Sequence, residues 1–265
     1  MPVLRRPDGA EIHWEERGGG PLVLLAPHSV AFPAIYADLI DQLARDHRVL
    51  TYDPRGAGES TRVVPSSEQE DIEDLEALLE AASGGAVGVG MGDGGARTAA
   101  VANRRPDLVG AVVVAGASSV PPGTLKGAQG PVSSPSVVES MIELADRNPR
   151  AGMRALLELT NPGMTPEQVR ARLDATLAYS SAEAILARHR WFYAGAALED
   201  LRALGDRLWI ARWESAWSPH EVTEELRKLL PKARIENLTE GAIARPDLTA
   251  DLVRKAVACV SEAQI

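Results

Sequence analysis

The chain has 265 residues, 45% of them apolar and 25% charged, which is the composition of a globular protein able to bury a sizeable core. Its 28 Lys and Arg residues against 37 Asp and Glu give a formal charge of -9, with no Lys/Arg-rich run, which argues against nucleic acid or an anionic membrane as partner. The single cysteine, Cys259, can close no disulfide within the chain and leaves no Cys/His spacing for a metal site.

Strand-like and helix-like segments alternate along the chain, which is typical of a mostly parallel sheet with helices packed on it. Before the middle of the chain, after a polar hairpin-like opening at 11–16, we predict strands at 21–26, 48–53, 86–91 and 111–115 and helices at 35–43, 71–82 and 95–104. After residue 204 we predict strands at 208–212 and 234–238 and helices at 221–230 and 248–260. The acidic run 68–76 is interpreted as a solvated helix face.

The segment between these two halves differs in composition. Residues 120–130 are rich in Pro, Gly and Ser, and residues 137–198 have helical periodicity with polar turns and no convincing strand. We therefore predict an α/β core domain at residues 1–120 and 205–265, interrupted by a helical cap at residues 121–204.

Two motifs in the first half carry a resemblance to a known family. Residues 53–60 read D-P-R-G-A-G-E-S, and residues 89–95 read V-G-M-G-D-G-G, followed by P-D-L-V at 106–109. The first is similar to the D-x-R-G-x-G-x-S turn of the α/β-hydrolase fold. The second resembles the nucleophile elbow of that fold, in which small residues flank the nucleophile on a tight turn between a strand and a helix. The resemblance covers nearly the whole chain outside the predicted cap.

The resemblance also implies where a catalytic triad would lie, and other residue types occupy those places. With Gly90 and Gly94 as the flanking small residues, Gly92 stands in the position of the nucleophile. The position of the acid, counted back from Pro219, falls on Ser215, with Glu214 beside it, and the position of the histidine falls on Ala242. We therefore predict a divergent member of the superfamily without the hydrolytic triad. An alternative register makes Asp93 a displaced nucleophile, flanked by Met91 and Gly95.

Two ionisable residues fall at the positions that the family uses for its oxyanion-binding N–H groups. In the alignment these are His28, in the loop 26–29 that reads A-P-H-S, and Asp93. A histidine and a carboxylate that converge on a cavity can act as general acid and base, so these two are the predicted catalytic residues. The alternative interpretations are a locally bonded turn residue for His28 and a helix cap for Asp93.

The remaining candidate residues would line a ligand pocket. Aromatic residues near the cap and near the position of the triad acid could form its wall, and we expect His189 and His220 to be exposed. The predicted substrate-binding residues are Ser29, Met91, Gly92, Trp191, Tyr193, Trp213, Glu214 and Trp217.

Three function classes follow from these residues. The first is cofactor-free, non-hydrolytic acid/base catalysis on a small organic molecule held between core and cap, as in a lyase, cyclase or isomerase. The second is a non-catalytic ligand-binding or regulatory protein, and the third is a hydrolase that uses Asp93. We expect no cofactor, no metal, no nucleic acid and no membrane partner, and leave a homodimer open. Without a run of roughly 20 apolar residues or a signal-like start, the expected location is cytoplasmic.

Overall fold

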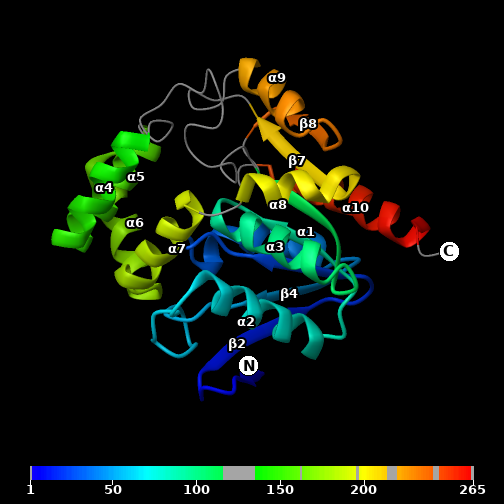
Figure 1. The fold of residues 1–265 in the computed structure, drawn as a ribbon, viewed down its shortest axis with the longest axis horizontal. Helices are drawn as coiled ribbons and strands as arrows, with labels where there is room; N and C mark the ends of the chain where they lie inside the picture. Colours follow the sequence, from blue (N-terminus) through cyan, green and yellow to red (C-terminus); the bar gives the residue numbers. More distant parts are fainter. Residues whose placement is uncertain are drawn as a thin grey trace.

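In the computed structural model, which describes residues 2–115, 135–161, 163–194, 197–213, 220–240 and 245–263, a single eight-stranded sheet organises the chain (Figure 1). The strand order is β1-β2-β4-β3-β5-β6-β7-β8, with β1 and β2 antiparallel to their neighbours and the strands from β4 to β8 parallel. The strands are β1 Val3–Arg5, β2 Glu11–Arg17, β3 Leu22–Ala26, β4 Arg48–Tyr52, β5 Ala86–Gly90, β6 Val109–Ala115, β7 Leu208–Trp213 and β8 Arg234–Leu238. The predicted α/β class with a mostly parallel sheet is confirmed.

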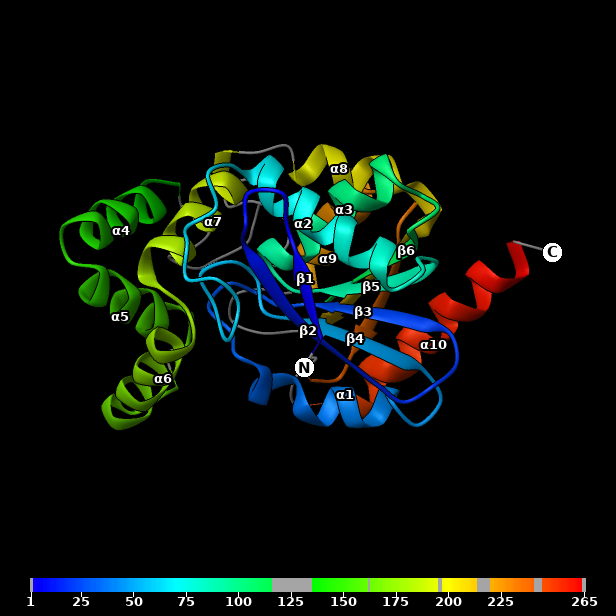
Figure 2. The same ribbon diagram turned by 90° about the horizontal axis from the view of Figure 1, so that it is seen from below.

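Helices cover both faces of this sheet because its central strands are apolar on both sides. Every residue of β3 and of β5 is buried, as a parallel strand between two helical layers requires. One face packs against α2 Glu68–Ala81, α3 Asp93–Arg104, α8 Ala197–Leu204 and α9 His220–Leu229. The other packs against α1 Ala37–Leu43, which follows the 3₁₀ helix η1 Pro33–Tyr36, and against α10 Pro246–Ala263 (Figure 2).

The helices of the predicted cap lie together at one side of the sheet domain (Figures 1 and 2). They are α4 Pro135–Arg147, α5 Pro149–Thr160, α6 Pro166–Tyr179 and α7 Ala182–Ala194. Helix α8, by contrast, packs against α3 of the sheet domain. The division into core and cap remains a prediction, and its proposed linker at 120–130 lies outside the described residues.

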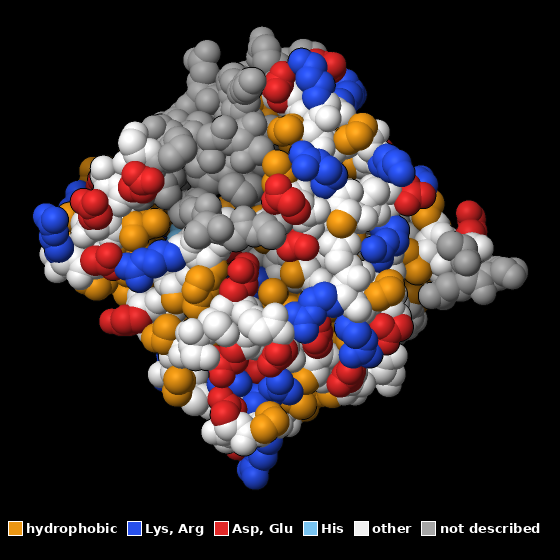
Figure 3. Space-filling model, viewed as in Figure 1, with side chains coloured by type: hydrophobic (Ala, Val, Ile, Leu, Met, Phe, Trp, Pro, Cys, Tyr) orange, Lys and Arg blue, Asp and Glu red, His pale blue; other side chains and the backbone are white. Residues whose placement is uncertain are grey.

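Polar contacts join α6 and α7 to the sheet domain. Tyr179 at the end of α6 donates its hydroxyl to Asp53 Oδ1 at 2.6 Å, and Arg188 of α7 pairs with Asp71 of α2. The acidic run on α2 is therefore not the solvated face that its composition predicts, because Asp71 and Asp74 are each only 4% exposed. Charged side chains of both signs are interspersed over the face of the molecule seen in Figure 3.

No helix among the described residues is long and apolar enough to cross a bilayer.

Candidate functional site

The sharp turn between β5 and α3 forms the centre of the candidate site. Gly92 lies in this turn with φ 51° and ψ -130°, a conformation that residues with a side chain rarely adopt. A Cβ atom at Gly90 would lie 2.5 Å from the backbone N of Gly95, and one at Gly94 would lie 2.6 Å from the carbonyl oxygens of Ala26 and Pro27. The turn therefore has room only for residues without a side chain at 90 and 94, which agrees with the register that places Gly92 at its apex.

The side chain of His28 occupies the space in front of Gly92. A Cβ atom built at residue 92 would lie 2.6 Å from Nε2 and 2.5 Å from Cδ2 of His28. The loop after β3, which carries His28, reaches this point because β3 and β5 are neighbours in the sheet and both end at the same edge. An imidazole thus fills the volume that a side chain at position 92 would need.

His28 and Asp93 form a close pair. Nδ1 of His28 lies 3.0 Å from Oδ1 of Asp93, and the N–H of Val30 lies 3.3 Å from the same nitrogen. The two contacts require opposite protonation of Nδ1, because the N–H of Val30 would donate to a lone pair there and the carboxylate needs a proton. The contact with the carboxylate is shorter and charge-assisted, so we assign the proton to Nδ1 and the hydrogen bond to Asp93, and the 3.3 Å contact with Val30 is then not a hydrogen bond. In the neutral ring the lone pair then belongs to Nε2, the atom that faces the apex of the turn.

Asp93 is a buried, fully engaged carboxylate. Oδ1 accepts hydrogen bonds from the N–H of Ser29 at 3.1 Å and from its hydroxyl at 3.2 Å, and Oδ2 accepts one from Arg97 at 2.6 Å. Burial by itself raises the pKa of Asp93, but the positive charge of Arg97 and the contact with His28 hold that pKa well below its usual value. Asp93 is the first residue of α3, and none of these bonds goes to the helix backbone, so the simple capping interpretation is wrong.

Of the two backbone N–H groups predicted to form the oxyanion site, one is hydrogen-bonded within the described part of the protein and the other is not. The N–H of His28 donates to the hydroxyl of Tyr36 at 3.3 Å. The N–H of Asp93, in the first turn of α3, has no acceptor among the described residues. One of the two predicted donors is thus available at the helix N-terminus.

His189 of α7 is a member of the site that the sequence did not indicate. The prediction that it is exposed is wrong: the residue is 8% exposed, and its ring centroid lies 5.6 Å from that of His28. Its Nδ1 lies 2.9 Å from the carbonyl oxygen of Ile185 and 3.3 Å from Oγ of Ser29. Because a carbonyl can only accept, we assign the proton to Nδ1, and burial together with His28 lowers the pKa of His189.

This lowered pKa predicts a pH-dependent stability. Unfolded His189 takes up a proton near pH 6.5 and the folded form only at a lower pH, so the free energy of unfolding should fall as the pH is lowered through that value. We expect the free energy of unfolding to fall more steeply in wild type than in His189→Gln below about pH 6.5, with parallel curves above pH ~7. Urea unfolding between about pH 7 and 5.5 measures the free energy of unfolding, and an equal pH dependence of that free energy in both proteins would contradict the assignment.

A chain of buried ion pairs links the site to α2 and α7. Arg97 reaches both Asp93 and Asp71, the latter at 3.3 Å, and Arg188 binds the two oxygens of Asp71 at 2.9 and 2.6 Å. All four side chains are 4% exposed or less. The carboxylate beside His28 is therefore connected through two arginines to the helix that carries His189.

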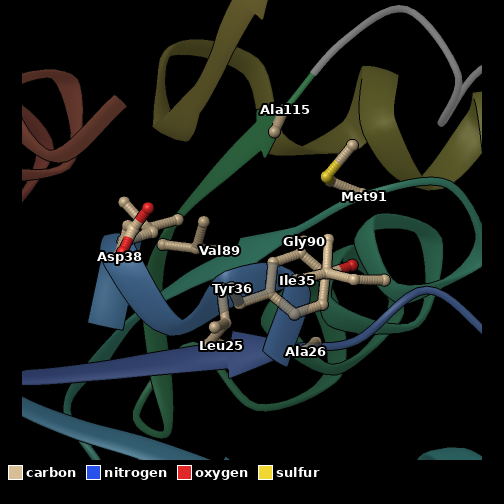
Figure 4. A pocket seen from close by; sticks show the side chains of 10 residues that line it. Leu25, Ala26, Ile35, Tyr36, Asp38, Val89, Gly90, Met91 and Ala115 are labelled. Carbon is tan, nitrogen blue, oxygen red and sulfur yellow. The ribbon is translucent and has the colours of Figure 1, made fainter. Parts of the chain in front are cut away.

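Two hollows adjoin the site. The first is a small hollow, partly open to solvent, lined by Ile35, Tyr36, Val89, Met91 and Ala115 among others (Figure 4). The second is also small and lies among α4, α5 and α7, and His189 forms part of its wall.

The other predicted site residues divide into three groups. Met91 lines the first hollow, and Ser29 contacts Asp93 and His189. Trp191 and Trp213 are half-buried, at the end of α7 and of β7, with no contact to His28 or Asp93 among the interactions described. For the third group, either the whole residue or its side chain lies outside the described part of the structure: Tyr193, Glu214, Ser215, Trp217, His220 and Ala242. In the described part of the chain, no group of three or more His, Cys, Asp or Glu side chains could hold a metal ion.

Comparison with known proteins supports the fold and gives the family. A family model described as "Alpha/beta hydrolase family" matches residues 18–250. Among solved structures, one from work on the carboxylesterases of Nitrososphaera gargenis matches with a TM-score of 0.72 and 19% identity, over 99% of this chain and 100% of that one. The enol-lactonase from Burkholderia xenovorans LB400 matches with a TM-score of 0.70 and 18% identity over 98% and 100% of the two chains. A thermophilic esterase from Thermogutta terrifontis matches with a TM-score of 0.73 and 20% identity over 97% of each chain. The family model covers most of the sequence, and the chain therefore belongs to the α/β-hydrolase family.

Proposed function

We propose that this α/β-hydrolase-fold protein is a cofactor-free acid/base catalyst rather than a hydrolase with a covalent intermediate. In this proposal it acts on a small organic molecule held between the sheet domain and the cap, by elimination, cyclisation, isomerisation or rearrangement. The observation that supports it is the position of His28, whose Nδ1 is paired with Asp93 and whose Nε2 faces the apex of the β5–α3 turn. Gly92, at that apex, has no side chain to attack a substrate.

The chemistry follows from the arrangement of this pair. Nε2 of His28 would take a proton from the substrate, and the carboxylate of Asp93 would stabilise the imidazolium that forms. Negative charge that develops on a substrate oxygen could be met by the N–H of Asp93 and the positive end of the α3 dipole. Return of the proton from Nε2 to another substrate atom completes an isomerisation. In an elimination the electrons of the broken C–H bond form the new double bond, a leaving group departs with its own electron pair, and Nε2 then gives the proton to the leaving group or to solvent.

The geometry counts against Asp93 as a nucleophile. Both of its oxygens already accept hydrogen bonds, and Arg97 neutralises its charge at 2.6 Å. An attacking carboxylate would have to give up these bonds in a buried position, which costs several kcal/mol.

A base-catalysed ring opening tests the proposal without knowledge of the natural substrate. In nitrobenzisoxazole, removal of the ring carbon's proton by a base breaks the N–O bond and yields a coloured cyanophenolate, with no other reactant. We expect wild type to accelerate this elimination and His28→Gln to lower the rate about 100-fold, the lower end of what a positioned base supplies. Asp93→Asn should also lower it, because the ring then loses the carboxylate that orients it and stabilises its cation.

Two parallel measurements separate the other functions. Equal elimination rates in wild type and His28→Gln would contradict the proposal and favour a non-catalytic ligand-binding protein. Turnover of nitrophenyl esters, or covalent labelling by a fluorophosphonate, would instead identify a hydrolase. His47→Gln is the control variant, since His47 directly precedes β4, at the opposite end of the parallel strands from His28, and pairs with Asp46.

A further inference from the structure

Arg172 stands out among the partly buried cations of the described chain. It lies on α6, and its guanidinium carbon is 5.0 Å from the centroid of the Phe32 ring. One helical turn further, Thr176 donates its hydroxyl to the carbonyl oxygen of Val30 at 3.2 Å. This face of α6 is therefore fixed over the loop that begins at His28.

Arg172 has no counter-ion in the described part of the chain. The buried arginines Arg55, Arg97 and Arg188 each pair with a carboxylate. No Asp or Glu lies within ion-pair distance of Arg172, and its Nε is buried without a hydrogen-bond partner. Burial lowers the pKa of this guanidinium, which is the expected sign of a cation that has lost water and gained no anion. Among the described residues, no negative charge therefore balances that of Arg172.

Tyr36 ends the short helix η1, which begins directly after Phe32, the residue whose ring Arg172 covers. The charge of Arg172 favours the ionised form of the Tyr36 phenol, but burial dominates and raises the pKa of Tyr36 to about 12. The phenol therefore keeps its proton. Its oxygen accepts the N–H of His28 at 3.3 Å, and its O–H has no acceptor among the described residues. The ring lines the apolar hollow with Ile35, Val89 and Met91 (Figure 4).

We propose that Arg172 and Tyr36 bind a carboxylate group of the ligand beside His28, with the apolar part of that ligand in the hollow next to Met91. The substrate class is then a small organic anion with one carboxylate. A guanidinium and a phenolic O–H provide donors for one such group, and a single negative charge balances a single Arg. This inference rests on the proposed function for the place of the reaction, and it adds which part of the molecule is recognised.

Benzoate and its neutral counterpart benzamide test the site by isothermal titration calorimetry. We expect wild type to bind benzoate more tightly than benzamide, and Arg172→Gln to weaken benzoate binding about 10-fold while leaving benzamide unchanged. Arg172→Lys should retain part of the preference, since it keeps the charge but not the planar fork. Arg170→Gln is the matched control, because Arg170 lies on the same helix, is exposed and loses the same charge.

The outcomes are distinct for this inference and for the proposed function. Equal benzoate affinity in Arg172→Gln and Arg170→Gln, or no preference for benzoate over benzamide in wild type, would overturn the anion site. A thermal melt that matches Arg170→Gln shows that Arg172→Gln is folded. His28→Gln should still bind benzoate, so retained binding with an unchanged elimination rate in that variant would refute the general-base function alone. Benzoate should also shift the NMR resonances of the His28 ring in wild type, and unshifted resonances would refute the location.

Discussion

Replacing Asp71 by Asn should lower the free energy of unfolding by about 3–5 kcal/mol. Asp71 is the only carboxylate within ion-pair distance of Arg188 in the described chain, and it also contacts Arg97. All three side chains are 4% exposed or less. With an amide at position 71, the buried guanidinium of Arg188 has no counter-ion among the described residues, and that of Arg97 keeps only Asp93 as its ion-pair partner. The cost of the unpaired buried charge of Arg188 accounts for most of the lost stability.

Urea unfolding measures this effect, with Glu158→Gln as a surface control. Glu158 pairs with Arg154 at 2.7 Å, but both are exposed, so its loss should cost no more than about 0.5 kcal/mol. The double variant Asp71→Asn with Arg188→Gln should recover part of the stability, because it removes the charge that the single variant strands. A loss below about 1 kcal/mol in Asp71→Asn would mean that water or another group compensates the arginines.

Replacing Gly90 by Ala should cost about 3 kcal/mol, the upper part of the usual range for an inserted methyl in a packed site. The new Cβ would lie 2.5 Å from the N and 2.6 Å from the Cα of Gly95. These are backbone atoms of the first turn of α3, so no side-chain rotation relieves the contact, and the helix has to move away from β5. The displacement carries Asp93 with it, so the elimination rate should fall together with stability.

Gly19→Ala is the matched control for this substitution. A Cβ at Gly19 has no atom within 4 Å, and Gly19 needs no left-handed conformation, so the change should be close to neutral. Chemical denaturation of the two variants side by side gives the difference. If both variants unfold at the same denaturant concentration, the turn is more tolerant than its backbone spacing indicates.

The sheet and the contact between His28 and Asp93 could be predicted because each rests on local pattern. Apolar runs define β3 and β5, and the two residues follow the carboxyl ends of those strands, which are neighbours in the sheet. Parallel strands bring such positions to one edge. The sharp turn could be predicted too, because the glycines at 90 and 94 mark the places where a side chain has no room.

The buried charges could not be predicted from the same patterns. Asp71 stands in an acidic helix that reads as solvated, and its partner Arg188 is 117 residues away in sequence. The residues around Asp71 and Arg188 in the sequence do not differ from those around an exposed charge. Only the three-dimensional structure, which brings Arg188 of α7 to Asp71 of α2, shows that the two are paired. His189 was misjudged for the same reason, since its neighbours Arg188 and Arg190 are charged.

The contact between Gly92 and the His28 ring limits what this scaffold can become. Serine at position 92 and the imidazole at its present place exclude each other, since the first atom of the new side chain would lie 2.6 Å from Nε2. A serine at this position therefore requires the His28 ring to rotate away from its present place in contact with Asp93. A side chain at position 92 and the proton transfer proposed for His28 in its present orientation would therefore compete for the same small volume.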